Sequence, residues 1–252
     1  MSEVDIKQNL KIVLDTIEES FKKRPTNLLT RKPHLVAVSK TKPAEAVVAA
    51  YDAGQRHFGE NYVQEMVEKA SHPQILERCK DIKWHFIGHL QSNKINKVLS
   101  VPGLYMIETV DSIKLATGIN KAWEKLRTEE MGHLKVLVQV KTSEEDAKSG
   151  IAPEEASELY KFIKDQCPNL CVEGIMTIGA FGHDYSKGPN EDFITLMKCY
   201  DHVVQELELD PNEVHVSMGM SNDYDHAIVA GSTIVRVGSS IFGSRTPKSD
   251  AK

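Results

Sequence analysis

Short apolar segments alternate with helical segments along this chain, and this alternation limits the fold more than any other feature. The apolar segments are rich in Val, Ile and Leu, which is typical of strands buried on both faces. Strands that alternate with helices form a parallel sheet with its helices outside. We predict eight strands, at residues 35–38, 57–59, 82–87, 104–107, 134–140, 171–178, 214–216 and 233–237. Eight repeats in about 210 residues favour a single (β/α)8 TIM barrel of the α/β class over an open doubly wound sheet.

The helical segments have apolar residues at helical spacing or recognisable ends. A helix over residues 6–21 precedes the first strand, so we expect it to cover one side of the barrel as an extra element. The segment 62–79 predicts a single helix, with Asn61 as a candidate N-cap. Asp111 is the candidate N-cap of a helix that runs to residue 127.

Composition and charge describe an ordinary globular chain. No linker divides it, so we expect one domain over residues 1–245 and a frayed polar tail over 246–252. The net charge of −5 gives no reason to expect nucleic acid as a partner. No apolar run is long enough to cross a membrane, and the N-terminus lacks the apolar core of a secretory signal. We therefore expect a cytoplasmic protein and leave a mitochondrial pool open.

The residues that could bind a metal lack the required spacing. Of the four cysteines, only Cys167 and Cys171 are close, and no clustered partners complete a zinc site. We therefore expect free thiols and no metal. His85 and His89 lie four residues apart across a strand end and a loop, where they do not share a helical face. We expect hydrogen-bonded histidines there rather than a metal pair.

Lys40 is the principal candidate for chemistry. It follows the strand 35–38, and Pro43 fits the first turn of the next helix, so Lys40 lies where a strand ends and a loop begins. In a barrel of this kind the active site lies at the carboxyl ends of the strands. The alternative is that Lys40 is one more solvated lysine.

Two Gly- and Ser-containing loops at the last strand ends are candidate phosphate sites. Residues 217–221, SMGMS, precede a helix, and residues 237–240, VGSS, follow the last strand. Glycine lets backbone N–H groups approach an anion, and serine hydroxyls add donors. Either loop alone could be an ordinary turn, but barrels frequently bind phosphate after strands seven and eight.

A lysine facing a phosphate site suggests Schiff-base chemistry. Its amine must be neutral to attack an aldehyde, and partial burial with Lys42 as a nearby like charge would lower its pKa. Two classes fit this pattern, an aldolase-like enzyme and a protein that holds pyridoxal 5′-phosphate. Arg236 favours the second, because a permanent cation near the pyridine nitrogen would disfavour a protonated ring. Arg236 could instead pair with a carboxylate inside the barrel. Lys148 could reach the mouth of the same site.

Several motifs in the correct order resemble the pyridoxal phosphate homeostasis proteins. The resemblance runs from about residue 34 to residue 245 and extends to the barrel domain of alanine racemase and ornithine decarboxylase. Its motifs are VAVSKTKP, FGENYVQE, WHFIGHLQSNK, KSGI, GIMTIG, SMGMS and RVGSSIFG.

The resemblance implies a fold type III barrel that binds pyridoxal phosphate covalently through Lys40. It places Arg236 opposite the ring nitrogen and Asn61 along the pocket wall, unless Asn61 serves as the helix cap. The implied phosphate contacts are Ser221, Gly238 and Ser239, with Ser217 as a further candidate.

Enzymes of this fold continue into a second domain that supplies further catalytic groups, whereas only nine residues follow Gly243 here. We therefore expect a monomeric protein that binds pyridoxal phosphate without efficient catalysis. The resemblance implies a role in vitamin B6 homeostasis and in amino-acid and keto-acid balance. Pyridoxal-phosphate-dependent apoenzymes are the candidate acceptors of the cofactor. The alternatives are a small racemase or decarboxylase and, in outline only, a Schiff-base aldolase.

Overall fold

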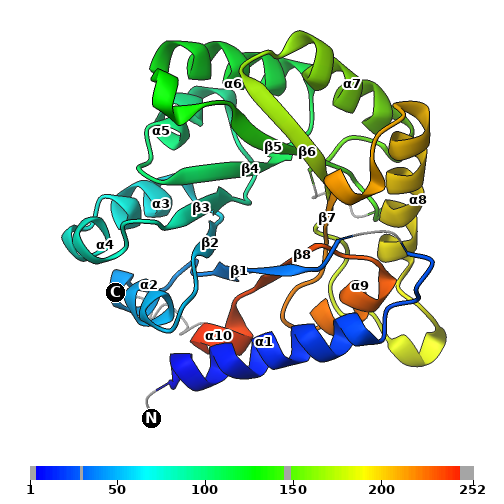
Figure 1. Cartoon of the computed structure of the whole chain (residues 1–252), viewed down its shortest axis with the longest axis horizontal. Coiled ribbons are helices and arrows are strands. Elements are labelled where there is room, and N and C mark those ends of the chain that lie inside the picture. Colours follow the sequence, from blue (N-terminus) through cyan, green and yellow to red (C-terminus); the bar gives the residue numbers. More distant parts are fainter. Residues whose placement is uncertain (1–3, 29–30, 145–148, 245–252) are drawn as a thin grey trace, which may run out of the picture.

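Eight parallel strands close into a barrel in sequence order (Figure 1). The computed structural model describes residues 4–28, 31–144 and 149–244. Closure occurs between the first and last strands, where Val36 pairs with Arg236. The predicted (β/α)8 barrel is confirmed. The strands are β1 (His34–Val38), β2 (His57–Glu60), β3 (Lys83–Phe86), β4 (Leu104–Val110), β5 (Leu134–Gln139), β6 (Leu170–Met176), β7 (His215–Ser217) and β8 (Ile234–Val237).

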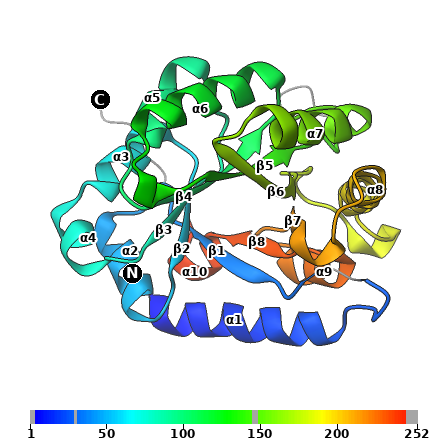
Figure 2. The same cartoon turned by 45° about the horizontal axis from the view of Figure 1, so that its top comes forward.

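The helices form a ring outside the strands (Figures 1 and 2). This arrangement follows from their amphipathic faces, which bury apolar residues against the sheet. The α-helices are α1 (Ile6–Lys22), α2 (Ala44–Asp52), α3 (Val63–Ala70), α4 (Pro73–Arg78), α5 (Ile95–Leu99), α6 (Ile113–Leu126), α7 (Ala156–Gln166), α8 (Glu191–Glu206), α9 (Tyr224–Ala230) and α10 (Ser239–Phe242). Short 3-10 turns are η1 (Ser92–Lys94), η2 (Glu129–Met131), η3 (Pro153–Glu155), η4 (Tyr185–Lys187) and η5 (Pro211–Glu213).

The extra helix α1 lies along the outside of the barrel against α9 and α10 (Figure 2). The Asn9 side-chain amide donates to the carbonyl of Ile241 at 3.0 Å. Just beyond the helix, Arg24 donates to the carbonyls of Ile228 at 2.8 Å and Ser232 at 2.5 Å. These contacts join the start of the chain to its last elements.

Two helix predictions need correction. The segment predicted as one helix over 62–79 is two helices, because Pro73 lacks an N–H and fixes its own backbone angle, so a new helix begins there. The N-cap of α3 is Tyr62 and not Asn61. The N-cap of α6 is Ser112 and not Asp111, since the Ser112 hydroxyl accepts from the Leu115 N–H at 3.0 Å.

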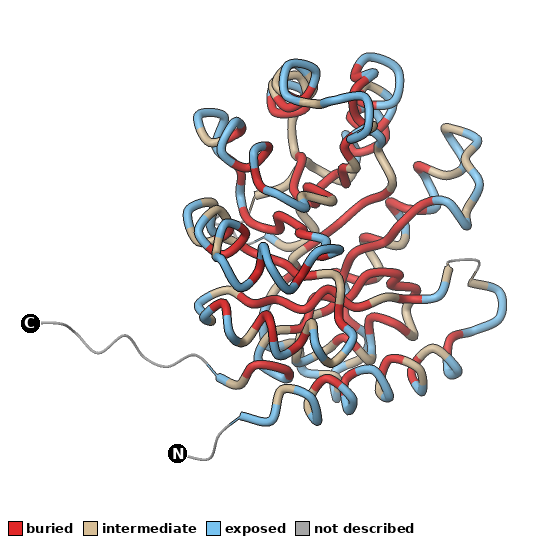
Figure 3. Tube along the Cα trace, turned by 60° about the vertical axis from the view of Figure 1, so that its left-hand side comes forward, coloured by how far each residue is buried: buried red, intermediate tan, exposed pale blue. Residues whose placement is uncertain are grey.

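The strands are buried between the helices and the barrel interior (Figure 3). One interior layer is apolar, and it comprises Val36, Met106, Leu137, Met176 and Ile234. Polar side chains of Glu60, His85, Glu108, Ser217 and Arg236 are buried as well. Since buried polar groups need partners, their contacts bear on what the interior does.

The remaining expectations concern thiols, metals and membranes. Cys79, Cys167 and Cys199 are buried, Cys171 is exposed, and all four are free thiols as expected. Within residues 4–28, 31–144 and 149–244, no cluster of His, Cys, Asp and Glu could hold a metal ion. No helix in those same ranges is long and apolar enough to cross a membrane. The predicted tail 246–252 and Lys148 lie outside the described residues.

Candidate functional site

A cavity of about 440 Å³ lies at the carboxyl ends of the strands. Its lining comes mainly from the ends of β1, β2, β3, β6, β7 and β8 and from the loops that follow them. This is the end of the barrel where loops from different strands converge and where barrel enzymes keep their sites. Six of the seven predicted cofactor-binding residues line it, namely Lys40, Asn61, Ser221, Arg236, Gly238 and Ser239.

The loop that carries Lys40 is fixed by backbone contacts on both sides. The Ser39 N–H donates to the carbonyl of Gly59 at 3.1 Å, and the Lys42 N–H donates to the carbonyl of Ser39 at 3.0 Å. Thr41 has a φ of 64°, which is unusual for a residue with a branched side chain. Its N–H donates to Glu65 at 2.5 Å. Lys42 also lines the cavity, and its ammonium group donates to the carbonyl of Ser244 at 3.0 Å.

A buried ion pair packs behind the same loop. The Lys69 ammonium donates to Glu60 at 2.7 Å and to the carbonyl of Ser39 at 2.5 Å. The Ser39 hydroxyl donates to the same carboxylate at 2.6 Å. Burial raises the pKa of Glu60, and the charge of Lys69 opposes that effect. These contacts hold the residue before Lys40 at a fixed place.

Asn61 lines the cavity and has an unused side-chain acceptor. Its side-chain Oδ1 is buried and accepts no hydrogen bond from the described residues. The backbone of Asn61 lies so close to Gly88 that a Cβ there would approach the Asn61 carbonyl oxygen to 1.9 Å. Buried polar atoms normally have a partner, so the amide oxygen fits a polar group of a ligand.

Three hydrogen-bond donors converge between the loops after β7 and β8. The backbone N–H groups of Gly238 and Ser240 point at the Ser221 hydroxyl oxygen, at 3.2 and 3.4 Å. A Cβ at Gly238 would lie 3.0 Å from the Val38 carbonyl oxygen, so glycine lets the two backbones approach. Gly219 has a φ of 97°, which favours glycine. We call Ser221, Gly238, Ser239 and Ser240 the anion cradle, because its donors would complement a phosphate.

Arg236 lies on the floor of the cavity and is 3% exposed. Its guanidinium donates to the Ser217 hydroxyl at 2.6 Å and to the Thr177 carbonyl at 2.7 Å. Burial lowers the pKa of Arg236, and the charge of Glu108 opposes that effect. Arg236 thus lines the cavity and reaches the Glu108 carboxylate through Ser217, and its place beside a ring nitrogen stays a prediction.

Ser217 lies elsewhere than its predicted role requires. It is fully buried at the end of β7. Among the described residues, it is not part of the cavity lining. Its hydroxyl donates to Glu108 at 2.5 Å and accepts from Arg236. Because β7 ends at this residue and directs it into the barrel, Ser217 does not join the anion cradle.

Both histidines of the sequence prediction are hydrogen-bonded. His85 lies inside the barrel between His57 and Glu108, at 2.8 and 2.9 Å. His89 contacts the Ser149 hydroxyl at 3.0 Å. The expectation of hydrogen-bonded histidines is confirmed.

Sequence reasoning assigned no role to Glu108, and it included Ser240 only as part of the candidate phosphate loop 237–240. The signal for Glu108 was an acidic residue inside an otherwise apolar strand, which must be paired when it is buried. The N–H of Ser240 has no signal in the sequence beyond its place in the glycine loop.

Three comparisons identify similar proteins. The family described as alanine racemase, N-terminal domain, matches residues 12–246. The pyridoxal phosphate homeostasis protein of Bos taurus is 52% identical over 97% of this chain and 89% of its own length. That of Haemophilus influenzae is 40% identical over 96% of this chain and 97% of its own length. Among solved structures, PipY of Synechococcus elongatus PCC7942 with PLP bound has a TM-score of 0.75 and 29% identity, covering 95% of this chain and 100% of PipY.

Proposed function

Because the chain belongs to the family of pyridoxal phosphate homeostasis proteins, we propose that it binds pyridoxal 5′-phosphate and regulates the availability of this cofactor. The observation that carries the proposal is the convergence of Lys40, Arg236 and three residues of the anion cradle on one cavity of about 440 Å³; the three are Ser221, Gly238 and Ser239. A cavity of this size suits a small cofactor. Pyridoxal phosphate has a ring nitrogen that a cation can face, a phosphate that backbone N–H groups can bind, and an aldehyde that an amine can attack.

Each residue of the cavity has a distinct proposed task. The anion cradle binds the phosphate through the Ser221 hydroxyl and the N–H groups of Gly238, Ser239 and Ser240. Lys40 attaches the aldehyde as a Schiff base. Arg236 faces the ring nitrogen, and Asn61 meets a polar group at the ring edge. When bound, pyridoxal phosphate supplies an electron-accepting ring, and a permanent cation beside the nitrogen weakens that capacity.

We further propose that the protein holds the cofactor without efficient catalysis. Reactions at an amino-acid α-carbon need an acid or base placed close to the reacting atom. Asp223 is the carboxylate in the described cavity lining, and its Oδ1 already accepts from the Met220 N–H at 2.8 Å. Pyridoxal-phosphate-dependent apoenzymes are the proposed acceptors of the cofactor. We propose a monomer that works in the cytoplasm and influences amino-acid and keto-acid balance.

A small racemase or decarboxylase is the second candidate. It is favoured by Asp223, because burial raises the pKa of this carboxyl group and so makes it a better base. The relatives are pyridoxal phosphate homeostasis proteins, which favours the two pyridoxal phosphate functions over the aldolase.

Visible absorption spectroscopy tests cofactor binding at Lys40. Wild type, Lys40→Ala and the control Lys42→Ala are each mixed with pyridoxal phosphate, and the excess is removed. We expect a retained Schiff-base band in wild type and in Lys42→Ala and its loss in Lys40→Ala. An equal band in all three, or none in wild type, would contradict the assignment.

Incubation of the loaded protein with amino acids in deuterated water separates the carrier from the enzyme. A carrier gives at most stoichiometric exchange of the α-proton. Sustained multiple-turnover exchange that Asp223→Asn abolishes would establish the second candidate instead.

A further inference from the structure

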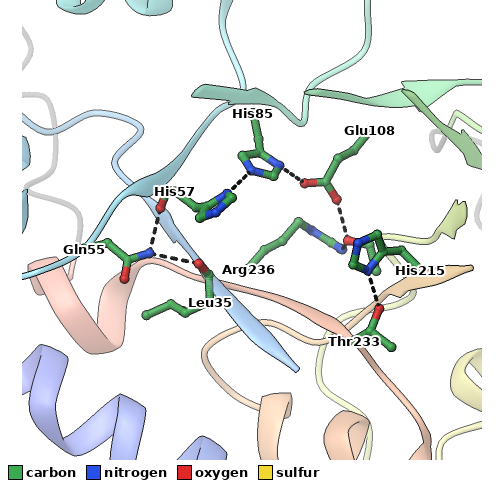
Figure 4. Close-up of polar contacts among 9 residues, drawn as sticks. Leu35, Gln55, His57, His85, Glu108, His215, Thr233 and Arg236 are labelled. Carbon is green, nitrogen blue, oxygen red and sulfur yellow. Dashed lines mark hydrogen bonds and ion pairs between the residues drawn. The ribbon is translucent and has the colours of Figure 1, made fainter. Parts of the chain in front are cut away.

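A chain of polar contacts runs through the barrel from the cavity floor toward the amino ends of the strands (Figure 4). Arg236 donates to Ser217 at 2.6 Å, and Ser217 donates to Glu108 Oε1 at 2.5 Å. The second carboxylate oxygen, Oε2, lies 2.9 Å from His85 Nδ1. His85 Nε2 in turn lies 2.8 Å from His57 Nδ1. The chain thus joins side chains of five strands.

Both neighbours of Glu108 in this chain donate to its carboxylate. An ionised carboxylate can only accept, so His85 Nδ1 carries a proton and donates to Glu108 Oε2, while His85 Nε2 contacts His57 Nδ1 behind it. On the other side the Ser217 hydroxyl donates to the carboxylate and accepts from the guanidinium. Both oxygens of Glu108 are therefore fixed by donors from opposite sides.

The burial of these groups makes their charges consequential. His85, Glu108 and Ser217 are fully buried, and Arg236 is 3% exposed. Burial raises the pKa of Glu108, but its hydrogen bond with His85 and the charges of His85 and Arg236 outweigh this effect and lower it to about 2. The carboxylate is therefore ionised and offsets the charge of the guanidinium. A buried cation without such an offset is costly.

We propose that Glu108 is a positioning residue for cofactor binding, which holds the Arg236 guanidinium on the cavity floor through Ser217 while His85 fixes the carboxylate from behind. The inference rests on the proposed function, because it assigns Arg236 to the ring of pyridoxal phosphate. It deepens that function, since Glu108 and His85 do not line the cavity in the described part of the chain. Their effect on the ligand must pass through Arg236.

A double-mutant cycle tests this dependence. The dissociation constant for pyridoxal phosphate is measured for wild type, Glu108→Gln, Arg236→Gln and the double variant. Glutamine keeps the size of Glu108 and removes its charge. We expect Glu108→Gln to weaken binding about tenfold when Arg236 is present, the size typical of a hydrogen bond to a charged group. With Arg236 already replaced, the same change should weaken binding less than about twofold. The absorption band of the bound cofactor should follow the same pattern.

If Glu108 only stabilised the barrel, Glu108→Gln would weaken pyridoxal phosphate binding by the same factor with Arg236 present and with Arg236→Gln, because a distorted barrel does not depend on Arg236. That result, or unchanged binding in Glu108→Gln, would overturn the proposal. If Glu108→Gln does not fold by near-UV circular dichroism, Ser217→Ala replaces it in the cycle with the same two criteria. Ser217→Ala removes the hydroxyl that joins Arg236 to Glu108, and it keeps the charges of both residues.

The failure of the inference is distinguishable from the failure of the proposed function. If wild type binds no pyridoxal phosphate, the proposed function fails and the inference falls with it. If wild type binds through Lys40 and the two changes are additive, the role of Glu108 alone is wrong.

Discussion

Lys69 Nζ lies 2.7 Å from Glu60 Oε1 behind the loop that carries Lys40, and these side chains are 8% and 0% exposed. Lys69 also contacts Glu65 at 2.7 Å, whose carboxylate accepts from the Thr41 N–H. The pair therefore connects α3 to both neighbours of Lys40 in the sequence. A buried pair of this kind is costly to break from one side, because the remaining charge has no partner.

Lys69→Met should destabilise the fold because it leaves Glu60 ionisable and unpaired in the barrel wall. We expect the free energy of unfolding to fall by about 3–5 kcal/mol, measured by urea denaturation. Lys161→Met is the matched control, since Lys161 pairs with Asp165 at 2.6 Å on the surface. That change should cost less than about 1 kcal/mol. Equal losses in the two variants would contradict the structural role of the buried pair.

Gly88→Ala should weaken both the fold and the site. A Cβ at this position would lie 1.9 Å from the Asn61 carbonyl oxygen, so the Asn61 loop must move away from the cavity. We expect a loss of about 1–3 kcal/mol in the free energy of unfolding and weaker pyridoxal phosphate binding. Gly118→Ala is the control, because its Cβ would meet only the flexible end of Ile95 at 3.0 Å. Unimpaired cofactor binding in Gly88→Ala would show that the Asn61 loop is not part of the site.

Ser221→Ala should lower affinity only for ligands that carry a phosphate. The Ser221 hydroxyl lies at the centre of the anion cradle, between the N–H groups of Gly238 and Ser240. We expect the dissociation constant for pyridoxal phosphate to rise about tenfold. The constant for pyridoxal, which lacks the phosphate, should stay within about twofold. Equal losses for the two ligands would place the phosphate somewhere else.

The fold should lose stability in mild acid because of three histidines at the amino ends of the strands. Burial lowers the pKa of His34 to about 4 and the pKa values of His57 and His215 to about 3. All three are neutral in the folded protein, whereas in the unfolded chain they bind protons near pH 6.5. Unfolding therefore takes up protons between about pH 6.5 and pH 4, and the free energy of unfolding falls as the pH falls.

Each histidine contributes at most about 1.4 kcal/mol per pH unit, and His57 contributes less because solvent reaches part of it. Urea denaturation at pH 7, 6 and 5 measures the slope. His215→Gln should make this slope shallower by about one proton, or about 1.4 kcal/mol per pH unit. A slope that is identical in wild type and His215→Gln would refute this assignment.

The sequence predicted the strands well because most of them are short apolar runs buried on both faces, and this signal does not depend on which strands are neighbours. Lys40 and the glycine loops could be found for a related reason, since a strand end in a barrel fixes where the following residues lie. The helix ends were less accurate. Ser112 and Asp111 are both good N-cap residues, and only the position of the loop decides between them.

The interior contacts could not be predicted, because they depend on closure of the barrel. Glu108 lies on β4, far in the sequence from Ser217 and Arg236 on β7 and β8, and β1 must pair with β8 before the register of Arg236 is set. Ser217 was expected at the phosphate because it begins the SMGMS loop, and the sequence does not show which way its side chain points. Its loop reaches the cavity, but the pleat of β7 turns its own side chain inward.

Reductive trapping tests the central claim most directly. The loaded protein is treated with borohydride, which converts a Schiff base to a stable amine, and peptides are then mapped by mass spectrometry. The account predicts one phosphopyridoxyl group per chain, on Lys40, and none there in Lys40→Ala. A label that lies mainly on Lys42 or another lysine, or no label in wild type, would contradict the claim that Lys40 anchors pyridoxal phosphate in this cavity.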